Sequence, residues 1–288
     1  MTGGAVTPTL AAWGLTRAPF EGTADPEFYF PSDGHAEALA RLEFLARESG
    51  TQLGLLTGEL GCGKSLVRAL FAARSAPFRL VAQLTSSHYP WTDLLRDLLG
   101  QLGAADFSAT AGESELVARL QRVAEARRVP IVLLFDEAQE LSREALVGMR
   151  ALTNLADGRL DITLILVGQP ELRRRLLELP QLDQRAGLRY HLQPLEPAQT
   201  AAYLEFRLRA AGHPDGGLFT PEAAAELAAG TRGVPREINR VARLALAMAA
   251  ARLAPQIEAA ARQAPRVEAA AVRAVLLDLE HQRGRGEA

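Results

Sequence analysis

Short apolar runs recur along the first two thirds of the chain, and a turn and a stretch with helical periodicity follow each one. The runs cover residues 53–57, 78–84, 131–135, 162–168 and, more weakly, 188–195. Runs that are apolar on both faces are typical of strands in a parallel sheet that helices cover on both sides. The pattern therefore predicts an α/β domain built on a five-stranded parallel sheet.

The segments around this domain differ in composition. Residues 1–31 hold four prolines and four glycines, which predicts an irregular arm packed on the domain. After Leu195 no strand-like run appears, and alanine-rich patterns have helical spacing. They cover residues 197–211, 221–229, 235–253 and 266–282. We expect an α/β domain over 32–195, a helical domain over 196–282 and a disordered tail over 283–288.

Charge, apolar runs and cysteine content indicate the cellular location of the protein and the kinds of site that it can contain. The net charge is −2, so no overall positive field favours nucleic acid or an anionic membrane surface. No stretch reaches the roughly 18 uninterrupted apolar residues of a membrane span, and the N-terminus lacks the features of a signal peptide. These observations predict a cytoplasmic protein without a membrane span. Cys62 is the sole cysteine and the five histidines are dispersed, which indicates neither a disulfide nor a protein metal site.

The segment GELGCGKS, residues 58–65, contains the only lysine among 32 basic side chains. It fits the phosphate-loop spacing G-x-x-x-x-G-K-[ST], follows a predicted strand and opens a predicted helix. Its glycines let backbone N–H groups turn inward around phosphate at a helix N-terminus. The compact lysine ammonium can reach the β- and γ-phosphates, where the wide guanidinium of arginine would not fit. The expected nucleotide contacts are Gly58, Glu59, Leu60, Gly61, Cys62, Gly63, Lys64, Ser65 and Leu66.

A second motif, LLFDEAQEL, ends the third apolar run in two carboxylates. We expect Asp136, through water, and the Ser65 hydroxyl to hold Mg²⁺, and Glu137 to polarise the attacking water. A solvated acidic helix start is the alternative interpretation of this pair. The letters DEAQ also look like a helicase box, but a helicase needs two such domains and roughly 350 residues.

Taken together, the motifs resemble the AAA+ ATPases and, within that class, the ExeA-like group (general secretion pathway protein A). The resemblance runs from about Trp13 to Leu279. It rests on the order of FYFPSDGHAEAL, TGELGCGKS, LLFDEAQEL, LILVGQPELR, LDQRAGLRYHLQPL and GVPREINRVARLAL. It implies a three-layer α/β/α domain with strand order 5-1-4-3-2, a helical lid, hydrolysis of ATP with Mg²⁺, and assembly into a ring or an ATP-dependent oligomer.

The resemblance also implies roles for three residues outside the two motifs. Gln169 matches sensor 1, which orients the hydrolytic water. Arg185 matches the arginine finger that a neighbouring subunit presents, although Arg189 and the arginines at 173–175 are close competitors. Arg236 matches sensor 2, at the start of a lid helix. The alternative interpretations are a polar loop residue, a surface arginine and a solvated cation at a helix start.

Three functions remain open from the sequence. The first is an oligomeric ATPase that assembles or remodels an envelope complex, such as secretion or pilus machinery, through an unidentified protein partner that recruits it to the inner face of the membrane. The second is an ATP-dependent DNA-binding regulator of transposition, similar to TniB. The third is a nucleotide-loaded switch or scaffold with negligible hydrolysis.

Several features weigh among these functions. The net negative charge and the lack of a basic tail weigh against DNA binding. The presence of Glu137 and Arg185 weighs against a switch without hydrolysis. The chain also stops after the predicted lid, without the membrane span and peptidoglycan-binding region of fuller ExeA-type proteins, which leaves the secretion role open.

Overall fold

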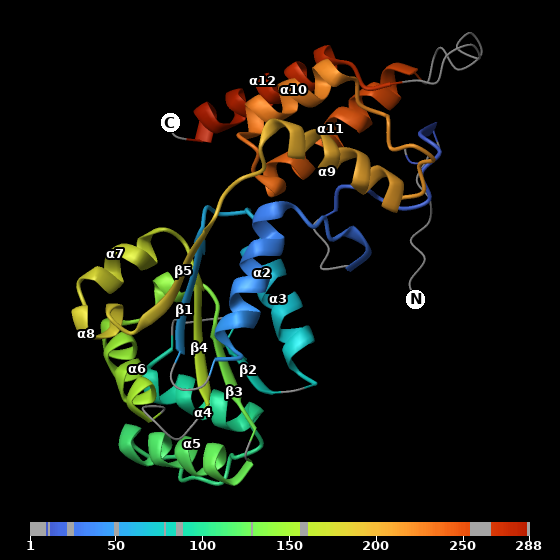
Figure 1. Ribbon diagram of the computed structural model, residues 1–288. Helices are drawn as coiled ribbons and strands as arrows, with labels where there is room; N and C mark the ends of the chain where they lie inside the picture. Colours follow the sequence, from blue (N-terminus) through green and yellow to red (C-terminus); the bar gives the residue numbers. More distant parts are fainter. Residues whose placement is uncertain are drawn as a thin grey trace. The chain divides into compact units, whose positions relative to one another are not determined.

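The computed structural model describes residues 10, 12–21, 26–48, 52–77, 79–84, 89–127, 129–155, 161–253 and 266–286. The chain divides into two compact units (Figure 1). One is Asp33–Gln193, which we call the α/β unit, and the other combines Met1–Ser32 with Pro194–Ala288, which we call the helical unit.

The α/β unit is built on one five-stranded sheet. Its strands are β1 (Gln52–Gly58), β2 (Leu80–Leu84), β3 (Ile131–Phe135), β4 (Ile162–Gly168) and β5 (Ala186–Leu192). All neighbouring strands pair in parallel, and their order is β2-β3-β4-β1-β5. This is the predicted order 5-1-4-3-2 counted from the other edge, so the predicted fold class is confirmed. The central strands β3 and β4 are buried along their whole length, because their apolar residues are covered on both faces.

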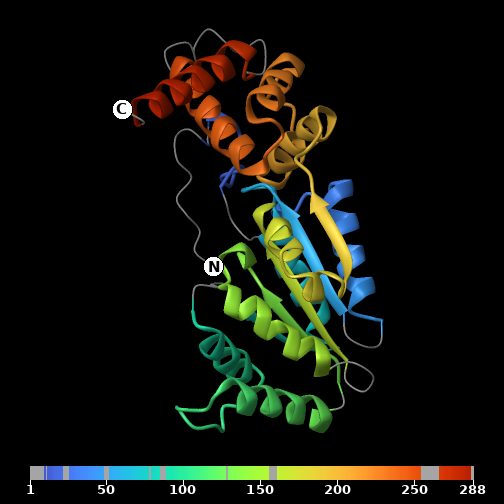
Figure 2. The same cartoon turned by 90° about the vertical axis from the view of Figure 1, so that its left-hand side faces the viewer.

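Helices cover both faces of the sheet. On one face lie α2 (Asp33–Leu45) and α3 (Lys64–Ser75), and on the other lie α6 (Arg143–Leu155), α7 (Glu171–Leu177) and α8 (Pro180–Asp183), as Figures 1 and 2 show. Helices α4 (Trp91–Gln101) and α5 (Glu113–Arg127) pack on each other beside β2, and the short 3-10 helix η2 (Ala138–Glu140) follows β3. Because all five strands are parallel, their carboxyl ends lie at the same end of the sheet, which is where ligands bind in such folds.

The helical unit contains four helices that follow the predicted periodic stretches. They are α9 (Pro197–Ala210), α10 (Pro221–Thr231), α11 (Pro235–Leu253) and α12 (Ala269–Gly286). Helix α10 begins as its sequence dictates, because Thr220 accepts a hydrogen bond from the Ala223 amide at 3.2 Å and proline fills the first helical position. A common apolar core joins these helices.

The N-terminal arm belongs to the core of the helical unit. Trp13 is buried and its indole N–H donates to the Leu246 carbonyl at 3.2 Å. The buried Arg207 guanidinium of α9 donates to the carbonyls of Pro19 and Glu21, at 2.6 and 2.7 Å. Composition predicted an irregular arm packed on the domain, but a proline- and glycine-rich segment carries no period that says which surface covers its aromatic residues.

Helix α12 extends beyond the predicted end of the helical domain. It continues to Gly286, so it includes four residues of the predicted tail. The extension has a tertiary contact, because Arg283 donates to the Glu237 carboxylate of α11 at 3.1 Å. Within the part of the chain that the structure describes, no helix has the length and apolar character to cross a membrane.

Candidate nucleotide-binding site

The loop between β1 and α3 has backbone geometry that requires its glycines. Gly61 and Gly63 have φ values of 86° and 98°, in the left-handed region that other residues rarely adopt. At Gly58 the constraint is space, because a Cβ atom would lie 2.7 Å from the Leu192 carbonyl oxygen of β5. The loop thus turns tightly from the strand into the N-terminus of α3, where backbone N–H groups lack helical acceptors.

Lys64, the first residue of α3, is buried and folds back over its own loop. Its Nζ donates to the carbonyl oxygens of Gly58 at 2.8 Å and Glu59 at 2.9 Å. Burial lowers the pKa of Lys64, and the negative charges of Glu137 and Asp136 act in the opposite direction. The fold therefore brings the predicted lysine and the two predicted carboxylates within electrostatic reach of one another.

Asp136, directly after β3, contacts a backbone amide and an arginine. Its Oδ1 accepts the Glu137 amide at 3.0 Å, and its Oδ2 forms a 2.9 Å ion pair with Nε of Arg68 on α3. Both side chains of the pair are largely buried, with 14% of Arg68 and 9% of Asp136 exposed. These two contacts orient Asp136, whose carboxylate oxygens can each accept more than one hydrogen bond.

Glu137 occupies an uncommon backbone conformation and has a dedicated side-chain partner. Its φ of 48° is left-handed, which is unusual for a residue other than glycine and recurs at functional sites. Nε2 of Gln139 donates to the Glu137 carboxylate at 2.7 Å, while Oε1 of the same amide accepts the Gln169 amide at 3.0 Å. A Cβ atom on Gly168 would lie 2.7 Å from that Oε1. Gln139 therefore bridges the predicted base and the predicted sensor 1 position.

Two residues of this site were missed from the sequence. Gln139 belongs to the quoted motif DEAQ, but only its two carboxylates were given roles. Arg68 follows the Lys64-Ser65 pair by one helical turn, and that spacing places it on the same side of α3 as Ser65. This spacing is the only signal that could have pointed to it.

Arg185 and two of its competitors for the finger role, Arg189 and Arg175, have contacts within this chain. Arg185 donates to the Thr153 carbonyl at 3.3 Å, near the end of α6. Arg189 pairs with Asp183 at 2.9 Å. Arg175 donates to two carbonyls in and after η2. The finger role of Arg185 stays a prediction, and it requires the arginine to leave the Thr153 carbonyl.

Arg236 lies in the helical unit, exposed at the second position of α11. The turn before the helix is tight, because Gly233 has a φ of 71° and its carbonyl accepts the Leu195 amide at 2.8 Å. Pro235 then occupies the first helical position. This geometry fixes the start of the helix, and the sensor 2 role of Arg236 stays a prediction.

Cys62 is a packing residue in the loop. Its side chain is fully buried, and burial raises the pKa of the thiol, against the effect of the Lys64 charge. A buried thiol with a raised pKa is a poor nucleophile and a poor redox group. Ser65, by contrast, is exposed at the second position of α3, which leaves its hydroxyl accessible to a metal ion.

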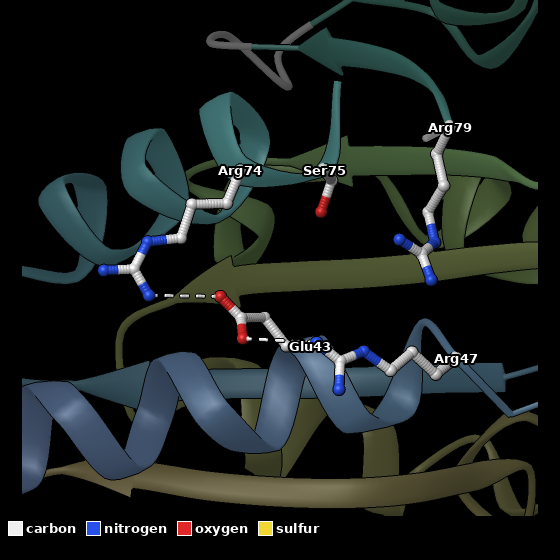
Figure 3. Close-up of a pocket in the computed structure, with 5 residues that line it drawn as sticks. All are labelled: Glu43, Arg47, Arg74, Ser75 and Arg79. Carbon is white, nitrogen blue, oxygen red and sulfur yellow. Dashed lines mark hydrogen bonds and ion pairs between the residues drawn. The ribbon is translucent and has the colours of Figure 1, made fainter. Parts of the chain in front are cut away.

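A separate pocket of about 470 Å³ lies at the C-terminal ends of α2 and α3, away from the phosphate loop at the start of α3 (Figure 3). It is lined by Glu43, Arg47, Arg74, Ser75 and Arg79. Glu43 pairs with Arg74 at 3.3 Å and with Arg47 at 3.9 Å, and Arg79 donates to a carbonyl just after α2. Along α3 the pocket is about 16 Å from Lys64. Cations at helix C-termini are favourable in themselves, so we assign the pocket no part in the candidate site.

Sequence comparison identifies the family. Residues 46–176 match the profile of a family described as "AAA domain". The chain is an AAA+ protein. This AAA+ chain is 34% identical over 248 residues to General secretion pathway protein A of Aeromonas hydrophila, which confirms the resemblance to the ExeA-like group. That match covers 83% of the chain but only 44% of the relative, so the chain spans less than half of that protein's length.

Solved structures support the AAA+ fold. The Aeropyrum pernix ORC2 protein in ADPNP–ADP complexes aligns with a TM-score of 0.65 and 19% identity, covering 90% of this chain and 71% of that one. Drosophila ORC bound to DNA aligns with a TM-score of 0.63 and 18% identity, covering 96% of this chain and 66% of that one. The Holliday junction branch migration motor RuvB of Thermotoga maritima aligns with a TM-score of 0.54 and 17% identity, covering 91% of this chain and 74% of that one. At these identities the likeness shows the fold alone.

Proposed function

We propose that this protein is an oligomeric ATPase that hydrolyses ATP with Mg²⁺ to assemble or remodel a partner complex of the cell envelope. The observation that carries the proposal is that the helix which begins at Lys64, after the glycine turn of the phosphate loop, is joined to the carboxylate pair after β3, because Arg68 one turn later pairs with Asp136 at 2.9 Å. A phosphate-binding loop and two carboxylates at the same edge of one parallel sheet are what phosphoryl transfer requires.

In this proposal the loop and the first carboxylate bind the substrate. The loop amides and the Lys64 ammonium bind the β- and γ-phosphates of ATP. Ser65 and Asp136 hold Mg²⁺, which neutralises phosphate charge when bound. Within the described residues no group of three or more His, Cys, Asp or Glu side chains could hold a metal by itself. This donor set suits an ion that phosphates and water coordinate for the most part.

The remaining residues act on the attacking water, the γ-phosphate and the rest of the nucleotide. Glu137 accepts a proton from the water. The water oxygen bonds to the γ-phosphorus, and the bond from that phosphorus to the β–γ bridging oxygen breaks, so that ADP leaves. Gln169 orients that water. Arg185 from a neighbouring subunit approaches the γ-phosphate, and Arg236 approaches the nucleotide from the helical unit.

Steady-state phosphate release tests the enzymatic part of the proposal. Wild-type protein is expected to release phosphate from Mg-ATP, and Lys64→Ala to neither bind ATP nor hydrolyse it, because the charge that faces the phosphates is lost. ATP binding by the wild type without measurable hydrolysis would favour the nucleotide-loaded switch instead. A Lys64→Ala variant that binds ATP normally would contradict the site.

The envelope partner is supported by the relative's name, General secretion pathway protein A. On this basis we propose a cytoplasmic ATPase that a membrane-associated protein recruits to the inner face of the membrane. The test is affinity purification from its own cells with Glu137→Gln held in ATP as bait and Lys64→Ala as control. We expect a component of secretion or pilus machinery to co-purify with ATP-loaded Glu137→Gln and not with Lys64→Ala. Co-purification of DNA-bound recombination proteins only would contradict the assignment.

DNA binding is the second candidate, because the fold is shared with Drosophila ORC bound to DNA. The net charge of −2 weighs against it. A TniB-like regulator should bind duplex DNA with Mg-ATP present, and the logarithm of its affinity should fall against log salt by about 0.9 per phosphate neutralised. Absence of binding at about 50 mM salt, with and without ATP, would exclude this candidate.

A further inference from the structure

The first turn of α2 touches the phosphate loop through one histidine. His35 is buried, and its Nε2 lies 3.0 Å from the carbonyl oxygen of Cys62. A Cβ atom on Gly63 would lie only 2.4 Å from the same nitrogen. The imidazole therefore lies directly against the backbone of the loop, at the residue that precedes Lys64.

The direction of this hydrogen bond follows from the chemistry of the two groups. A carbonyl oxygen only accepts, so Nε2 of His35 must carry the proton. Burial lowers the pKa of His35, which favours the neutral ring. A neutral ring that donates from Nε2 is the Nε2–H tautomer.

The contact determines the orientation of a backbone amide. The peptide between Cys62 and Gly63 is planar, and in a trans peptide the C=O and N–H bonds point in opposite directions. A donor that holds the Cys62 oxygen toward His35 therefore directs the Gly63 N–H away from His35. Gly63 has a φ of 98° and no Cβ, so little else in its own residue prevents this peptide from rotating.

We propose that His35 is a positioning residue that holds the Gly63 amide ready to bind the phosphates of a nucleotide. The inference rests on the proposed nucleotide binding and names a residue outside the loop motif that prepares it. Because a preformed loop lowers the cost of binding, loss of the contact should weaken ATP and ADP alike and leave kcat nearly unchanged.

Two substitutions separate the hydrogen bond from the packing. Leucine in His35→Leu fills much of the volume without a donor, whereas glutamine in His35→Gln offers an N–H at similar reach. By equilibrium titration with Mg-ATP and Mg-ADP, we expect His35→Leu to raise both Kd values about tenfold and His35→Gln to stay within about threefold of wild type. Arg41→Leu, an exposed change on the same helix, is the matched control and should bind as wild type does.

The outcomes distinguish this inference from the proposed function. Wild-type Kd values for His35→Leu, or a loss confined to kcat, would overturn the role of His35. Failure of the wild-type protein to bind either nucleotide would overturn the proposed function itself. If the variants do not fold, nitrogen-15 NMR of the wild-type protein still reports the tautomer of His35, once the ring signals of His35 have been assigned through their covalent connection to its backbone. The Nε2–H tautomer is expected, and an Nδ1–H tautomer at His35 would contradict the proposal.

Discussion

The side-chain amide of Gln139 donates a 2.7 Å hydrogen bond to the carboxylate of Glu137 and accepts the backbone amide of Gln169 at 3.0 Å. One residue thus joins the proposed base, which follows β3, to the end of β4. Such a bridge acts through the carboxylate that it orients, so its effect should be on the chemical step.

Gln139→Leu keeps the approximate size of the side chain and removes both hydrogen bonds. Because Glu137 then loses its orientation but stays in place, we expect kcat to fall about tenfold, which is part of the roughly 10²–10⁴ that general base catalysis contributes in full. The KM for ATP should change less than about twofold, since the phosphate loop is untouched. Steady-state kinetics measure both. An unchanged kcat, or a rise in KM alone, would contradict the positioning role.

The ion pair between Arg68 and Asp136 is expected to matter for folding as well as for the site. Arg68→Met removes the basic partner of a buried carboxylate, which should lower the free energy of unfolding by about 3 kcal/mol. Adding Asp136→Asn removes the stranded charge, so the double variant should recover stability and remain inactive. Urea unfolding of the wild type, the two single variants and the double variant gives the coupling free energy between Arg68 and Asp136. Equal stability of Arg68→Met and wild type would show that the pair contributes nothing.

The buried His35 should make stability depend on pH. Burial lowers the pKa of His35 below its ordinary value of 6.5. Above that value the ring is neutral in the folded and unfolded chain, and below it the unfolded chain takes up the proton first. Stability should therefore decline as the pH falls below 6.5, down to the lowered pKa of the folded protein. Urea titrations at about pH 7.5 and 5.5 should show a smaller decline in His35→Gln. An equal decline in both proteins would contradict the assignment.

The oligomer can be tested by mixing two inactive variants. Arg185→Ala should bind ATP normally and hydrolyse it more slowly by on the order of 10³, because the finger completes the site of a neighbour. Mixed with Lys64→Ala, it forms some interfaces with one intact loop and one intact arginine. Partial activity should return and rise with protein concentration. Normal hydrolysis by Arg185→Ala alone, or no recovery when the variants co-assemble, would direct attention to Arg189.

The features that the sequence predicted correctly are those that a short stretch of chain determines. The apolar runs and helical repeats each span one element, so local pattern was enough to find five strands and four C-terminal helices. The strand order came from the resemblance of the motifs. The nucleotide contacts from Gly58 to Leu66 stay a prediction, and one motif could name them all because they are consecutive.

The residues that escaped prediction act through partners in other elements. His35 contacts Cys62, which is 27 residues away, and Arg68 reaches Asp136 across the sheet from α3 to β3. Gln139 has its role only because β4 ends beside η2. A histidine, an arginine or a glutamine at such positions is an ordinary polar residue until the fold supplies its partner.

The central claim, that Glu137 activates water at a site that binds ATP independently of it, is tested by one paired measurement. Bound ATP and released phosphate are followed in the same samples of wild type and Glu137→Gln. The variant removes the base but keeps the size of the side chain and the whole phosphate loop. The account predicts wild-type ATP affinity with hydrolysis reduced by at least about 10². Hydrolysis by Glu137→Gln at the wild-type rate would contradict it.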